Sequence, residues 1–148
     1  MTIEISAQAM PALSEQDDPV AAAEAAIAAL SENYLVWVKD DLNAARAALV
    51  NARGTLPDNA EAIAELFGVC HNIKGQGGSF GFQMMTNIAE SLCDYIRDRA
   101  ASPEVRLQVI EAHLTALEFV IEREIKGDGG ESGQGLITKL KGYIENAA

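Results

Sequence analysis

Basic side chains are scarce in this sequence. Lysine and arginine together number 11 among 148 residues, against 22 aspartates and glutamates, which gives a formal net charge of −11. A chain of this charge offers no extended basic patch to neutralise phosphate groups. We therefore expect no nucleic acid and no anionic membrane surface as a partner.

Cysteine is equally scarce. Cys70 and Cys93 both lie in apolar stretches, and the N-terminal sequence does not resemble a signal peptide, since its first basic side chain is Lys39. These features predict a cytoplasmic protein whose thiols stay reduced and buried. The most hydrophobic stretch, residues 20–38, contains two glutamates, which argues against a membrane span.

Strand signals are missing as well, because no segment alternates apolar and polar residues between hairpin turns. Apolar residues instead recur at spacings of three and four, which is typical of helices that pack on other helices. A phase slip near Ser31 predicts a short extra N-terminal helix before the first long one. Short connections favour antiparallel neighbours, so the expected fold is all-α, an up-down-up-down antiparallel four-helix bundle. The apolar stripes occupy residues 20–30, 35–49, 62–80, 85–96 and 107–125.

Composition suggests four parts of the chain. The first, residues 1–17, has no period that could bury a face and is expected to be a flexible tail. Residues 18–126 form the bundle. Residues 127–135 are rich in glycine and are expected to be a linker. Residues 136–148 are expected to form a short C-terminal amphipathic helix.

One predicted helix, residues 61–82, carries a histidine and an unusual number of glycines. A glycine inside a helix costs about 1 kcal/mol relative to alanine, so some other factor must favour glycine here. At about 100° of rotation per residue, the apolar stripe points away from His71. We therefore expect the imidazole on the solvent face, where several neighbouring positions are glycines and carry no side chain. The residues that share its face are Phe67, Gly68, Lys74, Gly75 and Gly78.

An exposed imidazole of this kind can act as a nucleophile. In its neutral form, one ring nitrogen has a free lone pair. Lys74, one turn further along, can place its ammonium group against a negative charge on that nitrogen. Spacing alone leaves a simpler alternative open, in which the helix ends at Lys74 and His71 is an ordinary surface histidine.

The string from His71 to Gly81 resembles the signature of the histidine-containing phosphotransfer (HPt) domain, His-x-x-Lys-Gly followed by an apolar residue and a second glycine. The resemblance covers residues 20–126. It implies that His71 accepts a phosphoryl group from a receiver-domain phospho-aspartate and passes it to another receiver aspartate. By the same resemblance, Lys74 helps to bind the phosphoryl group and Gly75 leaves room beside the imidazole.

The resemblance also implies the partners and cofactors. The partners would be response-regulator receiver domains, a hybrid histidine kinase, or both, with Mg²⁺ on the receiver and no metal, cofactor or ATP site on this chain. A monomer is expected. The sequence departs from the common pattern at Gln76 to Gly78, where serine and alanine are more usual. Whether Gln76 contacts the partner or the protein's own core stays open, since it faces partly inward.

Three other functions compete with this interpretation. An ATP-dependent kinase is disfavoured, because the last glycine of the string from Gly75 to Gly81 falls one position late for a nucleotide-binding loop and no kinase motif follows. A metal site is disfavoured because Cys70 and His71 diverge by about 100° on a helix and Cys93 and His113 lie far along the chain. A non-catalytic helical adaptor bundle stays open, although it does not explain the glycines around one histidine.

Overall fold

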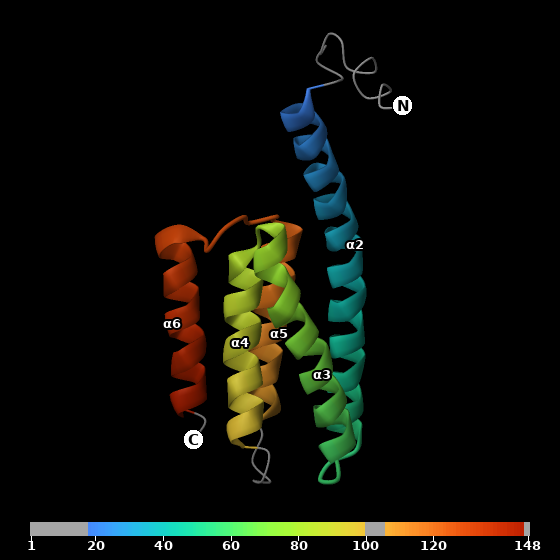
Figure 1. Cartoon of the computed structure of the whole chain (residues 1–148). Coiled ribbons are helices and arrows are strands. Elements are labelled where there is room, and N and C mark those ends of the chain that lie inside the picture. The colour runs from blue at the N-terminus through green and yellow to red at the C-terminus, as the bar shows by residue number, and fades with distance from the viewer. Residues whose placement is uncertain (1–17, 100–105, 147–148) are drawn as a thin grey trace. The chain divides into compact units, whose positions relative to one another are not determined.

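The computed structural model describes residues 18–99 and 106–146, and its regular elements are all helices (Figure 1). The expectation of an all-α chain is confirmed, since the described residues contain no strand. The predicted tail, residues 1–17, lies outside the described residues. None of the described helices combines the length and apolar character that crossing a membrane requires. The elements are α2 (Pro19–Gly54), α3 (Ala60–Gly77), the 3₁₀-helix η2 (Gly78–Phe80), α4 (Gln83–Asp98), α5 (Leu107–Glu122) and α6 (Gly130–Asn146).

Helix α2 is continuous, so the prediction of a separate short N-terminal helix is wrong. The phase slip near Ser31 does not interrupt it, because residues 20–30 are rich in alanine and contain neither glycine nor proline. The chain divides into two compact units, one ending at Tyr34 and one beginning at Leu35. A change in the apolar phase of a helix therefore does not by itself indicate where the helix ends.

The second unit contains the core and the helix that carries His71. In it, α4 packs against α3, α5 and α6, an arrangement consistent with the expected bundle (Figure 1). The Arg46 guanidinium of α2 donates hydrogen bonds of 2.8 Å to both carboxylate oxygens of Glu118, and so joins α2 to α5. The large, fully buried side chains of this core include Leu49, Leu66, Ile73, Met85, Ile88, Leu92, Ile110 and Leu114.

Helix α6 begins at Gly130, so residues 130–135 are helical and the expectation that they belong to a linker is wrong. Here glycine permits close packing. A Cβ atom on Gly133 would overlap the carbonyl oxygen of Asp128 and would lie 3.1 Å from Sδ of Met84 on α4. The composition that suggested a flexible linker therefore reflects a tight junction between α6 and α4.

The turn that leads into α6 is hydrogen-bonded to the segment that follows the His71 helix. The Gly127 N–H donates to the Gly81 carbonyl at 2.7 Å, and the Met84 N–H donates to the Gly127 carbonyl at 3.0 Å. Gly81 has φ of +87°, a left-handed conformation that favours glycine. The Lys126 ammonium lies 4.8 Å from the centre of the Phe82 ring. These contacts hold the segment that connects the end of α3 to the start of α4.

Candidate functional site

Helix α3 continues beyond Lys74 to Gly77 and is followed directly by η2. A helix that ends at Lys74, the structural part of the simpler alternative, is therefore wrong. His71 and Lys74 lie three residues apart on one regular helix, so their side chains project from neighbouring positions of the same face. Gly75 and Gly77 belong to the helix and Gly78 to its 3₁₀ extension, whereas Gly81 lies in the turn that follows.

The imidazole of His71 is exposed, on the side of α3 that its spacing predicts. Leu66 and Ile73 on the opposite side are fully buried. The half-buried Phe67 stacks on the imidazole, with ring centroids 6.1 Å apart and an angle of 14° between the ring planes. Since Phe67 precedes His71 by one helical turn, it covers one side of the ring and leaves the remainder open to solvent.

Open space flanks the histidine along the helix. A Cβ atom on Gly68 or on Gly75 would meet no described atom within 4 Å beyond the backbone of its own turn. These positions precede and follow His71 by three and four residues, so both lie beside the imidazole. We call the exposed surface around Gly68, His71 and Gly75 the clearing. A larger side chain at either glycine would project into it.

Gly78 and Gln76 follow Lys74 at the end of the helix. Gly78 belongs to η2, and a Cβ atom there would lie 2.8 Å from Oε1, the flexible end of the Gln83 side chain on α4. Gly78 is exposed and keeps right-handed helical dihedral angles, so its place on the His71 face stays a prediction. Gln76 is exposed, so it is not part of the core.

Lys74 is half-buried, and its backbone carbonyl is bonded to Thr86 of α4. Burial raises the pKa of the Cys93 thiol on α4, and the nearby positive charge of Lys74 partly opposes that rise. Burial, with a smaller contribution from Cys93, also raises the pKa of the Cys70 thiol. Both cysteines are free, buried and protonated at neutral pH, as their apolar surroundings in the sequence predict.

Two contacts at the end of α3 involve residues that spacing along the chain does not single out. The Thr86 hydroxyl of α4 donates to the Lys74 carbonyl at 2.8 Å and accepts from the Gly78 N–H at 2.9 Å. The Phe80 ring meets Trp37 of α2 edge-on, with centroids 6.3 Å apart. No sequence signal identifies Thr86, because its importance depends on how α4 packs against α3.

His113 does not belong to this site. It is fully buried, its Nδ1 lies 2.8 Å from the Val109 carbonyl, and its Nε2 lies 3.0 Å from the Ser91 hydroxyl. Because a carbonyl can only accept, Nδ1 carries the proton and Nε2 accepts from Ser91. Burial lowers the pKa of His113. Within residues 18–99 and 106–146, no three or more His, Cys, Asp or Glu side chains lie close enough together to hold a metal ion.

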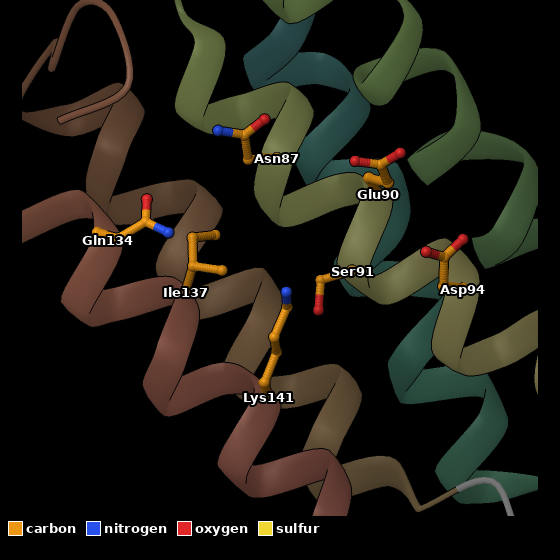
Figure 2. A pocket seen from close by; sticks show the side chains of 7 residues that line it. All are labelled: Asn87, Glu90, Ser91, Asp94, Gln134, Ile137 and Lys141. Carbon is orange, nitrogen blue, oxygen red and sulfur yellow. The ribbon is translucent and has the colours of Figure 1, made fainter. Parts of the chain in front are cut away.

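A groove of about 240 Å³ lies between parts of α4 and α6, and Figure 2 shows the side chains that line it. Glu90 and Asp94 give it negative charge, while Lys141 approaches from α6. Neither His71 nor Lys74 lines this groove. The clearing on α3 and the groove are therefore separate features of the surface. The remaining lining residues are Asn87, Ser91, Gln134 and Ile137.

The structure is thus a helical bundle that exposes one histidine, with a lysine one turn away and open space on both sides. Comparison with protein families identifies the class of protein. The model of the Hpt domain matches residues 29–123, more than half of the chain, and the chain belongs to this family. The family implies histidine phosphotransfer within a phosphorelay, by a carrier that has no kinase domain. Searches of curated proteins and of solved structures found no match.

Proposed function

We propose that this protein carries a phosphoryl group on His71, accepting it from the phospho-aspartate of one receiver domain and passing it to an aspartate of another. The observation that supports this proposal is the clearing, in which the imidazole is exposed between Gly68 and Gly75. The partners are response-regulator receiver domains, or the receiver of a hybrid histidine kinase. The residues assigned to the acceptor site all belong to one chain, so the proposed transfer requires only a monomer.

The transfer needs little from this protein beyond a correctly placed nitrogen. The lone pair of one imidazole nitrogen attacks the phosphorus, an N–P bond forms, and the P–O bond to the aspartyl carboxylate breaks. The carboxylate leaves with the bonding electrons, and the other ring nitrogen keeps its proton. The receiver supplies the divalent cation. The second transfer reverses these bond changes, with an aspartate of the next receiver as nucleophile.

Lys74 and Phe67 assist in different ways. The Lys74 ammonium, one turn from His71, neutralises charge on the phosphoryl oxygens as the group moves. Phe67 stacks on the imidazole, at 6.1 Å between centroids, and restricts its rotation. Gly68 and Gly75 let the receiver's acidic pocket approach the ring, and the exposed Gln76 borders the same surface. Because the chain is strongly acidic, docking depends on these local contacts and not on long-range attraction.

Labelling from a phosphorylated receiver domain tests the proposal. The wild-type protein should acquire an acid-labile, alkali-stable phosphate from the receiver and none from ATP alone. The His71→Gln variant should acquire no label. Asn72→Ala, which changes the adjacent exposed residue, should be labelled like the wild type. Label on the His71→Gln variant would rule out the assignment, whereas a wild-type protein that binds receivers but is never labelled would favour the adaptor alternative.

A further inference from the structure

The hydroxyl of Thr86 bridges two backbone groups at the end of the His71 helix. In a regular α-helix the N–H of residue 78 would bond the carbonyl of residue 74 directly. Here the Gly78 N–H donates to Oγ1 of Thr86 at 2.9 Å, and Oγ1 donates to the Lys74 carbonyl at 2.8 Å. Thr86 belongs to α4, so a side chain from the neighbouring helix completes the last turn of α3.

This bridge requires the two helices to approach closely, and a glycine permits it. Gly77 is buried, and a Cβ atom there would lie 2.9 Å from the Thr86 backbone nitrogen, the Phe82 carbonyl oxygen and Cβ of Met85. Any other residue at this position would push the first turn of α4 away from α3. Gly77 and Thr86 therefore pack against each other, next to the turn of α3 that carries Lys74.

The position of the Lys74 ammonium depends on that turn. A lysine side chain has four rotatable carbon–carbon bonds. The position of its backbone therefore sets the region that the ammonium group can reach. Without the hydroxyl, the part-buried Lys74 carbonyl and the Gly78 N–H would both lose a partner, and the last turn would rearrange to find new ones. Misplacement of a charged group by about 1 Å can slow a transfer step substantially.

We propose that Thr86 is a positioning residue for phosphoryl transfer, which holds the last turn of α3 so that Lys74 stays beside the phosphoryl group on His71. This inference rests on the proposed function, because it assigns a cause to the placement of Lys74. It extends the site from α3 to α4. Thr86 itself touches neither the imidazole nor the phosphoryl group in this role.

The test compares transfer rates from a phosphorylated receiver domain over a range of receiver concentrations. Thr86→Val keeps the shape of threonine and removes the hydroxyl. Because both hydrogen bonds of the hydroxyl are lost, it should lower the maximal rate about tenfold, the equivalent of about 1.4 kcal/mol, and leave the half-saturating concentration unchanged. Thr86→Ser, which restores the hydroxyl, should return the rate to within about twofold of the wild type. Thermal unfolding confirms that each variant is folded, and Thr86→Ala replaces Thr86→Val if the latter is not.

Thr138→Val provides a matched control. The Thr138 hydroxyl donates to the Gln134 carbonyl at 3.0 Å within α6, so the same chemical change is made away from the site. This variant should transfer like the wild type. Equal slowing by Thr138→Val and Thr86→Val would refute a role specific to the end of α3.

A double mutant separates positioning of Lys74 from a general structural effect. In a Lys74→Ala background, Thr86→Val should slow transfer by less than about twofold, because the group it positions is already gone. The same tenfold loss in both backgrounds would overturn the inference, as would a Thr86→Val protein that transfers normally. Absence of transfer in the wild type would instead refute the proposed function. The two failures are thus distinguishable.

Discussion

Gly75 and Gly77 lie two residues apart in α3, yet replacing each by alanine should change the free energy of unfolding in opposite directions. At Gly75 a Cβ atom meets no described atom within 4 Å beyond its own turn, so Gly75→Ala gains the helix propensity of alanine, about 1 kcal/mol. At Gly77 a Cβ atom would lie 2.9 Å from two backbone atoms of the α4 region and from Cβ of Met85. Backbone atoms cannot rotate aside, and overpacking of this kind costs about 2 kcal/mol. Gly77→Ala should therefore destabilise the protein by about 1 kcal/mol after its gain in propensity.

Urea and thermal unfolding, followed by far-ultraviolet circular dichroism, measure this difference. For a chain of this length, about 1 kcal/mol corresponds to a shift of about 3 °C in Tm, so the two variants should differ by about 6 °C. Gly142→Ala is the matched control, because a Cβ atom at this position of α6 is equally unobstructed. It should stabilise the protein like Gly75→Ala. If Gly75→Ala destabilises the protein, or Gly77→Ala stabilises it, the close approach of α3 and α4 is wrong.

A larger substitution at Gly75 should impair phosphoryl transfer without unfolding the protein. Gly75→Leu should leave the protein folded, since its side chain extends into the clearing, but it should slow phosphoryl transfer at least tenfold by blocking the receiver, an effect of about 1.4 kcal/mol or more. Gly142→Leu should fold and transfer like the wild type. Normal transfer by Gly75→Leu would refute the steric role of the clearing.

Two further predictions concern Lys74 and His113. Lys74→Ala should lower the maximal transfer rate about tenfold and change receiver affinity less, as measured by quenched-flow labelling, and equal rates would argue against an electrostatic role. Because burial lowers the pKa of His113, the unfolded chain takes up a proton before the folded protein does. The free energy of unfolding should therefore be fully retained above the ordinary histidine value of about 6.5 and should decrease as the pH falls below it. Urea titrations on both sides of that pH test this, and a His113→Gln variant that keeps the same pH dependence would contradict the assignment.

The helix that carries His71 was predictable because the pattern that specifies it is local in the sequence. Rotation of about 100° per residue places Leu66 and Ile73 on one side and His71 on the other, and the structure buries the first two and exposes the third. The motif that starts at His71 gives the family, which the domain match then confirms. The roles proposed for His71 and Lys74 stay predictions until transfer is measured.

Glycine was the least predictable residue type. Glycine-rich composition suggested a linker through Gly135, but Gly133 packs against Asp128 and Met84 within a helical region. Spacing places Gly78 on the His71 face, and there a Cβ atom would also meet the side chain of Gln83 from α4. A glycine can supply flexibility, open space or close packing, and the surrounding residues decide which of these applies.

The sequence by itself determined the all-helical fold class, the faces that the helices of the bundle bury, and the direction of His71, because each depends on residues within a few positions of one another. Only the tertiary structure decided that Thr86 completes the last turn of α3, that Gly77 lets α4 approach, and that α6 packs against α4. These contacts join residues from different helices, and no local period in the sequence specifies the distance between two helices or the side chain that bridges them.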